Sequence, residues 1–446
     1  MPAVDRPGLS GAATTVTPSG GRPVLPVAVD HADGRVLLGP LRAALSGAGP
    51  ALAPHARGRA PDPAAVAPLG PDEDDPGDPV AAVVSTTGST GAAKHVLLPA
   101  SALLASAGAT HDHLGGSGRW LLAVPAHTVA GVQVVVRSLV AGTSPAVLDL
   151  SQGFDADGFA AAAAAMTGTG RRYTSLVPTQ LRRLLQAAPA TGAAAALAGF
   201  DAVLVGGAAM DAQVREQAHA AGVRVVTTYG MTETCGGCVY DGVPLPGVQV
   251  RVEPLPGTAG PVGRVVLSGP VVARGYRGGP TAGAGEGFDR TPAGGRCFRT
   301  ADLGEQVAGR LELRGRTDDV VVSGGVNVAL DAVAAVVRAL PGVQDALAVG
   351  VPDLEWGHAV GVLVQPVGPG PGPGPDLVRE AVRERLGRAA VPRWLRTVTE
   401  LPTAGVGKPD RRGAVRLLQA GPQDADGPGL RDDVPPSTPR PEEPTA

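Results

Sequence analysis

The segment STTGSTGAAKH, which follows the apolar run AAVV, has the composition of a loop that binds phosphate. Its chemistry lies in two glycines, two hydroxyls and one ammonium group: Gly88, Gly91, Ser89, Thr90 and Lys94. The glycines allow the backbone to bend so that amides and hydroxyls face an anion. In a Walker A loop the lysine follows the second glycine directly, so this is a different arrangement. The residue types predict phosphate binding, with an ordinary Gly/Ser turn as the alternative.

A second polar segment, TYGMTET, closes the apolar run VRVVT. Tyr229 offers a flat face to a purine, Thr232 a hydroxyl to a phosphate oxygen, and Glu233 a hard oxygen ligand to Mg²⁺. Further on, FRTADLG places Asp302 after a predicted strand, where its carboxylate can accept from two ribose hydroxyls. These segments predict a nucleotide site. The alternative for TYGMTET is a strand end with a satisfied polar cap.

The basic residues are distributed unevenly between arginine and lysine. Of the 38 basic residues only Lys94 and Lys408 are lysines, and Lys408 lies in the Gly-rich segment LPTAGVGK. An arginine fork does not replace a compact, flexible ammonium at every phosphate or carboxylate oxygen. We therefore expect both lysines to be functional, the alternative being that they are retained by chance.

Short β-branched runs alternate with helical stretches from Val80 onward, which predicts an α/β fold. We expect buried strands at AAVVSTT, RWLLAVP, SPAVLDL, YTSLVP, DAVLVGG and VRVVTTYG, and helices over 158–168, 179–188 and 211–221. Shorter strands follow at VQVRVEP, GRVVLSG and GRLELRGR. The predicted architecture is a large N-terminal domain of layered, largely parallel α/β sheets and a small mobile α+β C-terminal domain. The expected divisions are a disordered tail over 1–20, an N-terminal ATP- and acyl-binding domain over 21–317, a C-terminal domain over 318–418 and a disordered tail over 419–446.

Composition excludes several classes of protein. The net charge is −3, so no basic field favours nucleic acid or an anionic membrane. The apolar stretches are broken by charges before they reach the length of a membrane span, so no membrane insertion is expected. Three cysteines cannot build a disulfide framework, which favours a reducing, cytoplasmic location. A homodimer is compatible with the sequence.

The order of these segments over residues 80–413 resembles the adenylate-forming superfamily of acyl-CoA synthetases, peptide-synthetase adenylation domains and luciferases. The resemblance implies ATP, Mg²⁺ and CoA as ligands, with Lys408, Thr232, Glu233 and His127 as catalytic residues and Glu233 as the metal ligand. It implies that Lys408 bridges the attacking carboxylate and the α-phosphate, and that Asp302 and Arg316 hold the ribose. The ATP and AMP contacts that it implies are Thr87, Gly88, Ser89, Thr90, Gly91, Lys94, Gly206, Gly207, Ala208, Tyr229, Gly230, Thr232, Asp302 and Arg316.

Four stretches are more specifically similar to the o-succinylbenzoate-CoA ligases of menaquinone biosynthesis, in their short actinobacterial form. They are LLAVPAHTVAGVQVVVRSLVAGTSP, YTSLVPTQLRRLL, GMTETCGGCVYDG and DDVVVSGGVNV. The resemblance places His127 and Arg137 at the acyl pocket, and Arg137 is expected to bind the second carboxylate of o-succinylbenzoate. Ser175 and Thr179 are expected to line the same pocket, although a helix N-cap is the plainer account of Thr179. A solvated helix charge is the alternative for Arg137, and a core or cap residue the alternative for His127.

In the C-terminal domain the resemblance implies a hinge at Asp318. It places Gly324, Gly325 and Trp356 near CoA, with a buried tryptophan as the alternative for Trp356. The expected activity is adenylation of o-succinylbenzoate followed by transfer to CoA. The alternatives are a CoA ligase for another aryl or fatty acid, an adenylation enzyme that loads a carrier protein, and a binding protein without turnover.

Two groups of residues suggest a metal or redox site, but each has a plainer interpretation. The pair Cys235 and Cys238 suggests a metal or redox site, but no suitable further ligands accompany it, so packing beside Glu233 is expected. We interpret His111 as part of a polar helix end.

Three positions depart from the family pattern. Ala93, His95 and Ala301 replace a proline and two glycines that are common in the family, and none of these changes removes a charged group that the mechanism needs.

Overall fold

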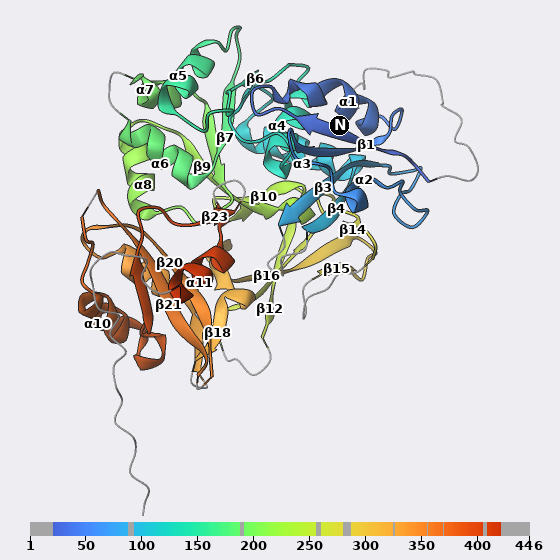
Figure 1. Ribbon diagram of the computed structural model, residues 1–446. Coiled ribbons are helices and arrows are strands. Elements are labelled where there is room, and N and C mark those ends of the chain that lie inside the picture. The colour runs from blue at the N-terminus through green and yellow to red at the C-terminus, as the bar shows by residue number, and fades with distance from the viewer. Residues whose placement is uncertain are drawn as a thin grey trace, which may run out of the picture. The chain divides into compact units, whose positions relative to one another are not determined.

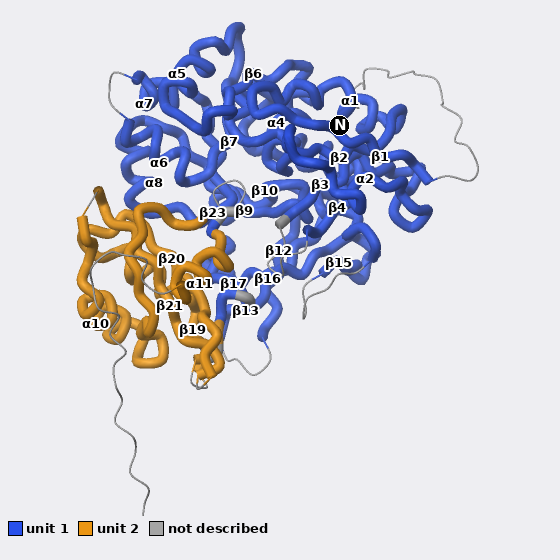
Figure 2. The backbone as a smooth tube through the Cα atoms, in the orientation of Figure 1, with its two compact units in different colours: residues 1–320, 403–409 blue, residues 321–402, 410–446 orange. Residues whose placement is uncertain are grey.

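The structure is a computed structural model (Figure 1). It describes residues 21–87, 93–187, 191–255, 260–279, 287–323, 326–354, 356–368, 370–404 and 408–420. The chain divides into two compact units (Figure 2). Unit 1 comprises 1–320 and 403–409, and unit 2 comprises 321–402 and 410–446. Residues 403–409 thus group with unit 1, whereas the chain on both sides of them belongs to unit 2.

The first sheet of unit 1 brings the phosphate-loop segment to a hairpin. Its strand order is β1 (Val24–Val29), β2 (Ala51–Ala56), β3 (Val80–Thr87), β4 (Ala93–Pro99) and β14 (Gly275–Tyr276). The pairs β1–β2 and β2–β3 are parallel, whereas β3–β4 and β4–β14 are antiparallel. The chain between β3 and β4 therefore connects two antiparallel strands, unlike a P-loop, which leads from a strand into a helix.

The second sheet of unit 1 has seven strands and carries TYGMTET at the end of a central strand. Its order is β11 (Val243–Pro244), β10 (Gly236–Tyr240), β9 (Val225–Met231), β8 (Ala202–Gly206), β7 (Arg172–Leu176), β5 (Arg119–Leu122) and β6 (Ala146–Val147). The strands from β6 to β9 pair in parallel, and β10 and β11 are antiparallel. This confirms the predicted α/β fold, and the expected parallel pairing dominates in this sheet, whereas the first sheet is mixed. The predicted strand SPAVLDL is reduced to the two residues of β6.

Both faces of the seven-stranded sheet are buried, which explains its continuous apolar strands. Alternate residues of β5 point to opposite sides, so Trp120 and Leu122 join one core cluster and Leu121 joins another. The first cluster contains α1 (Leu38–Leu45), α3 (Ala100–Leu114) and α4 (Val129–Val140), and it also reaches the first sheet. The second contains α5 (Ala156–Ala164), α6 (Pro178–Gln186), α7 (Ala193–Ala198) and α8 (Ala212–Ala220). The three predicted helices are thus α5, α6 and α8, and α5 ends four residues early.

A third, antiparallel sheet completes unit 1 and carries Asp302. It consists of β12 (Gln249–Pro254), β13 (Gly263–Ser268), β16 (Arg296–Val307) and β15 (Gly287–Arg290), with β17 (Arg310–Arg316) also paired to β16. Short helices η1 (Gly34–Leu37), α2 (Pro63–Val66), η3 (Thr232–Thr234) and η4 (Thr317–Asp319) lie between the strands of unit 1 in sequence. The hairpin of β23 (Thr403–Ala404) and β24 (Lys408–Pro409) contains Lys408.

Unit 2 is built on a sheet of β19 (Val326–Ala329), β18 (Val320–Ser323), β21 (Gly357–Pro366) and β20 (Val343–Asp353), with β22 (Trp394–Thr397) paired to β21. Its helices are α9 (Leu330–Arg338), α10 (Pro375–Leu386), η5 (Arg388–Ala390) and α11 (Arg411–Gln419). Helix α11 includes Gln419, the first residue of the expected C-terminal tail. The rest of that tail from residue 421, and the tail over 1–20, lie outside the described residues. Within the described chain, no helix is both long enough and apolar enough to cross a bilayer.

Candidate active site

Lys94 is held in a strand rather than in the loop that precedes it. It is the second residue of β4, where it pairs with Thr86 across the β3–β4 hairpin. Its Nζ lies 5.0 Å from the centroid of the Tyr276 ring, and its side chain is half-buried. The loop residues Gly88, Ser89, Thr90 and Gly91 lie outside the described residues, as does the side chain of Thr87. The structure thus places the predicted lysine on β4, close to the start of that strand.

The turn after β9 buries the predicted metal ligand. Thr232 and Glu233 are 8% and 7% exposed, and they lie in the short helix η3. Thr234 shapes the turn, since its hydroxyl accepts from the backbone N–H of Met231 and donates to the carbonyl of Gly236. Oε1 of Glu233 accepts a hydrogen bond of 2.8 Å from the hydroxyl of Tyr276, a residue that the sequence did not single out. A tyrosine at a strand end carries no local signal for this contact.

The Asp302 carboxylate is bound by two neighbours from other strands. The hydroxyl of Tyr229 donates to its Oδ2 at 2.6 Å, and Nη1 of Arg316 donates to its Oδ1 at 2.8 Å. Asp302 and Arg316 face each other across the register of β16 and β17, which explains the ion pair. Burial and the neighbouring carboxylate raise the pKa of Tyr229 well above its usual value, so its hydroxyl stays protonated. The three predicted nucleotide residues therefore form one cluster.

The predicted adenine segment, Gly206 to Ala208, lies at the end of β8, and β8 pairs with the strand that carries Tyr229. Gly206 ends β8 and pairs with Thr228, and a Cβ at Gly206 would lie 2.3 Å from the Thr228 hydroxyl oxygen. Gly207 has a φ of +85°, in the left-handed region that favours glycine. Ala208 is exposed. Glycine therefore allows the end of β8 to approach β9, which carries Tyr229 and Gly230.

His127 lies in the connection between β5 and α4, beside another histidine. The ring centroids of His31 and His127 are 5.9 Å apart in an edge-to-face arrangement. Burial lowers the pKa of His127, and His31, His55 and Arg59 lower it further. The imidazole is therefore mainly neutral at pH 7, so it can donate or accept a hydrogen bond without a net charge.

Arg137 lies in the core, which excludes the solvated helix charge as an explanation for it. Its side chain is 3% exposed, and its guanidinium lies 4.9 Å from the centroid of the Trp120 ring. Nη2 donates a long hydrogen bond of 3.4 Å to the Tyr240 hydroxyl, and Nε has no partner. Among the described residues no carboxylate forms an ion pair with it. Burial lowers the pKa of Arg137, because an uncompensated charge in the core is costly.

Ser175 and Thr179 lie near the start of α6 but differ in burial. Ser175 is 9% exposed in β7, whereas Thr179 is exposed. The N-cap interpretation of Thr179 is wrong, because the N-cap residue is Val177. The Gln180 side chain closes this helix end by accepting from the Val177 backbone N–H at 2.9 Å and donating to the Ala123 carbonyl at 3.0 Å. Pro178 at the first helical position places the cap two residues earlier than expected.

The predicted residues of the C-terminal region are described only in part. Asp318 lies in η4 and Lys408 in β24, but the side chains of both lie outside the described residues, as do Gly324 and Gly325 entirely. The Arg393 guanidinium lies 4.0 Å from the centroid of the Trp356 ring. Nε1 of Trp356 is buried without a hydrogen-bond partner. The Trp356 residue as a whole is half-buried, and the Arg393 guanidinium lies over the face of its ring.

The acidic residues fit a metal ion that arrives with a nucleotide. The described residues contain no cluster of three or more His, Cys, Asp or Glu side chains that could hold a metal by themselves. Mg²⁺ usually takes one or two carboxylates together with phosphate oxygens and water, and Glu233 offers one such carboxylate.

Cys235 and Cys238 are buried, and burial raises the pKa of both thiols, to about 12 for Cys238. Both stay neutral, in agreement with the packing role expected for them.

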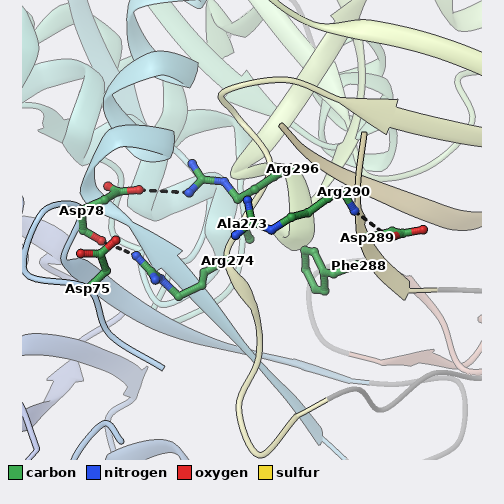
Figure 3. A pocket seen from close by; sticks show the side chains of 8 residues that line it. All are labelled: Asp75, Asp78, Ala273, Arg274, Phe288, Asp289, Arg290 and Arg296. Atoms are coloured by element: carbon green, nitrogen blue, oxygen red, sulfur yellow. Dashed lines mark hydrogen bonds and ion pairs between the residues drawn. The ribbon is translucent and has the colours of Figure 1, made fainter. Parts of the chain in front are cut away.

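A cleft of about 390 Å³ lies elsewhere in unit 1 and contains none of the predicted site residues. Its lining is mainly charged: Asp75, Asp78, Ala273, Arg274, Phe288, Asp289, Arg290 and Arg296 (Figure 3). Arg296 and Asp78 form an ion pair of 3.0 Å across it. Phe288 contributes one wall, and its ring also contacts Tyr276. Phe288 of the cleft thus packs against Tyr276, whose hydroxyl is hydrogen-bonded to Glu233.

Comparison with known proteins gives matches over most of the chain. Residues 28–277 match the family model described as AMP-binding enzyme, and residues 332–408 match the model of the AMP-binding enzyme C-terminal domain. The chain is 44% identical over 345 residues to a probable 2-succinylbenzoate–CoA ligase of Mycobacterium tuberculosis, covering 76% of this chain and 85% of the relative. It is 32% identical to the 2-succinylbenzoate–CoA ligase of Enterococcus faecalis, covering 62% of this chain and 58% of that protein.

Solved structures show the same fold. The o-succinylbenzoate CoA synthetase from Bacillus subtilis, in complex with its acyl-adenylate intermediate, has a TM-score of 0.62 at 24% identity, covering 78% of this chain and 70% of that one. ATP-bound MatB from Rhodopseudomonas palustris has a TM-score of 0.71 at 23% identity, covering 90% of both chains. At these identities the likeness supports the fold alone.

Proposed function

Because this chain belongs to the family of AMP-binding enzymes, we propose that it is an ATP-dependent acid–thiol ligase for o-succinylbenzoate (2-succinylbenzoate). It adenylates the acid and transfers the acyl group to CoA, a step of menaquinone biosynthesis. The mycobacterial relative, at 44% identity over most of its length, supports this substrate. The structural observation that carries the substrate assignment is Arg137, a buried guanidinium without a carboxylate partner among the described residues.

In the first half-reaction the substrate carboxylate attacks the α-phosphorus of ATP and pyrophosphate leaves. Asp302, held by Tyr229 and Arg316, accepts hydrogen bonds from the ribose, and Thr232 contacts the α-phosphate. Lys94 and the loop of Thr87 to Gly91 bind the phosphates, and Lys408 bridges the two reactants. Glu233 would hold Mg²⁺, which when bound would supply further positive charge to the phosphate oxygens. Fixed charges of this kind stabilise the charge that develops in the transition state.

Arg137 gives this ligase its preference for a dicarboxylate. An o-succinylbenzoate molecule keeps one carboxylate that does not react, and this group needs a cation in a dry pocket. Arg137 has an unpartnered Nε, so it gains a charged acceptor when that carboxylate enters. His127, Ser175 and Thr179 line the remainder of the acyl site. His127 is mainly neutral at pH 7 and so adds no competing charge there.

In the second half-reaction the CoA thiolate attacks the acyl adenylate and AMP leaves. The C-terminal domain that the sequence predicts over 318–418, which includes Lys408, turns about Asp318 between the two steps. This motion removes Lys408 and admits CoA. Gly324 and Gly325 line the path of the pantetheine arm, and Trp356 lies on the side of CoA. One active site thus performs both half-reactions in turn.

Pyrophosphate release tests this proposal most directly. The assay contains ATP and Mg²⁺ with o-succinylbenzoate, benzoate or a medium-chain fatty acid, each with and without CoA. Selective turnover of o-succinylbenzoate that requires CoA for thioester formation is expected. Turnover of another acid would refute the substrate, pyrophosphate release without a thioester to CoA would refute the acceptor, and nucleotide binding without release would refute the enzymatic function.

The proposed enzyme acts in the cytoplasm, where ATP and CoA are available and its three buried thiols stay reduced. Fractionation of cells followed by immunodetection tests this location. The homodimer that the sequence leaves open is tested by sedimentation equilibrium on the full chain.

A further inference from the structure

Tyr276 contacts two predicted site residues, Lys94 and Glu233, that lie far apart in the sequence. It ends β14, the edge strand of the first sheet, and pairs with Val96 of β4. Alternate residues of a strand share a face, so Lys94 and Val96 point to the same side of β4. Tyr276 is therefore the diagonal neighbour of Lys94, close enough for an aromatic ring and a long side chain to touch. This explains why the Lys94 ammonium lies 5.0 Å from the Tyr276 ring centroid.

The same tyrosine fixes the predicted metal ligand. Its hydroxyl donates to Oε1 of Glu233 at 2.8 Å, and the two side chains are 6% and 7% exposed. The segment that leads into β14 also holds the backbone there, because the Ala273 N–H donates to the Glu233 carbonyl at 2.8 Å. Glu233 is thus attached at both its side chain and its main chain to one short segment.

Aromatic packing holds the Tyr276 ring in place. The ring centroid of Phe288 lies 5.0 Å away at an interplanar angle of 74°, and that of Phe298 lies 6.4 Å away at 80°. Phe288 is also the aromatic wall of the charged cleft shown in Figure 3. A ring packed in this way has few rotamers, so its hydroxyl and its face are oriented before any ligand arrives.

We propose that Tyr276 is a positioning residue that holds the metal ligand Glu233 and the phosphate-binding Lys94 in one arrangement. This inference rests on the proposed function, which assigns the metal to Glu233 and phosphate to Lys94. The hydroxyl orients the carboxylate, and the ring face orients the ammonium. Loss of a hydrogen bond to a metal-ligating carboxylate typically weakens metal affinity by about 10- to 100-fold.

The Tyr276→Phe variant tests the hydroxyl, because it keeps the ring and removes only the oxygen. Binding of Mn²⁺ to the full-length enzyme with ATP, in the absence of any acyl substrate, is followed by the electron paramagnetic resonance signal of free Mn²⁺. We expect about a tenfold or greater loss of Mn²⁺ affinity, with the affinity for metal-free ATP unchanged. A Tyr276→Phe protein that binds Mn²⁺ as tightly as the wild type would overturn the proposal.

Tyr173→Phe is the matched control. Tyr173 is also buried, but its hydroxyl donates to the carbonyls of Leu114 and Gly116. This variant loses a comparable buried hydroxyl, so it reports any general effect on folding. Its Mn²⁺ affinity is expected to equal that of the wild type. An equal loss of Mn²⁺ affinity in both variants would mean that Tyr276 acts only through the stability of the fold.

Tyr276→Leu tests the ring face. It should lower the affinity for metal-free ATP, measured by equilibrium dialysis, which Tyr276→Phe leaves unchanged. Equal ATP affinity in a folded Leu variant would refute the link to Lys94, and if this variant does not fold, the Phe variant alone decides the proposal. Wild-type protein that binds neither ATP nor Mn²⁺ would instead refute the proposed function, so the two failures are distinguishable.

Discussion

The Tyr229 hydroxyl donates a hydrogen bond of 2.6 Å to the Asp302 carboxylate, although 73 positions separate these residues in the chain. The bond joins the end of a strand in the seven-stranded sheet to a strand of the third sheet. Arg316 holds the other carboxylate oxygen, so the orientation of Asp302 is fixed from two sides. If ribose binds at Asp302 as we propose, it meets a carboxylate that is already oriented.

Removal of the Tyr229 hydroxyl should weaken ATP binding. A hydrogen bond to a charged group contributes about 1.5–3 kcal/mol, so Tyr229→Phe is expected to raise the Kd for ATP by about tenfold or more. The measurement is isothermal titration with ATP. The KM for o-succinylbenzoate should change little, and an equal rise in both constants would contradict a specific role at the ribose.

Replacement of Arg137 should separate substrate binding from stability. Arg137→Met is expected to raise the KM for o-succinylbenzoate by about 100-fold, because a buried charged partner is lost, while the KM for ATP stays nearly constant. The free protein should be as stable as the wild type or more so, since the variant removes an unpaired buried charge. Steady-state kinetics and thermal denaturation measure the two effects, and an unchanged KM for the acid would dismiss Arg137 as a ligand.

Lys408 should act in only one of the two half-reactions. Lys408→Ala is expected to slow adenylation by about 10²- to 10³-fold, the usual loss when one preorganised charge or donor is removed from a transition state. Thioester formation from a supplied acyl adenylate and CoA should proceed at the wild-type rate. Rapid-quench measurement of each step checks this, and parallel loss of both steps would contradict the assignment.

His111 should make the protein less stable in acid. It lies in the last turn of α3, the helix end that the sequence predicted, but its own side chain is only 5% exposed and its Nε2 accepts from Trp120 Nε1 at 3.3 Å. Burial, together with the nearby Arg137, lowers the pKa of His111 to about 4 from an ordinary value of 6.5, despite the opposing effect of Asp112. The unfolded chain therefore binds the proton first, so the free energy of unfolding should fall as pH decreases from 6.5 to 4.

Urea denaturation at a series of pH values measures this dependence. The His111→Gln variant has no titrating group at this position, so its stability should change less between pH 6.5 and pH 4. His219→Gln is a suitable control, because His219 is exposed on α8. A wild-type slope that His111→Gln leaves unaltered would contradict the assignment.

The sequence by itself determined the fold class and the types of the reacting groups. Strand and helix patterns are local and follow from the alternation of apolar residues, so the parallel strands from β5 to β9 and helices α5, α6 and α8 were predictable. The roles of Glu233, Asp302 and the two lysines were inferred from residue type and order, and they stay predictions. The predicted N-cap at Thr179 failed because the cap depends on where Pro178 enters the helix.

Only the tertiary structure decided which groups meet. The contact of Tyr276 with Glu233 and Lys94 depends on the register of β14 against β4, and no local pattern near Tyr276 encodes that register. Arg137 was recognised as a candidate ligand, but its place over the Trp120 ring depends on how α4 packs against β5. Hydrogen bonds between residues separated by 43 or 73 positions arise from sheet pairing and packing, which the sequence pattern alone does not specify.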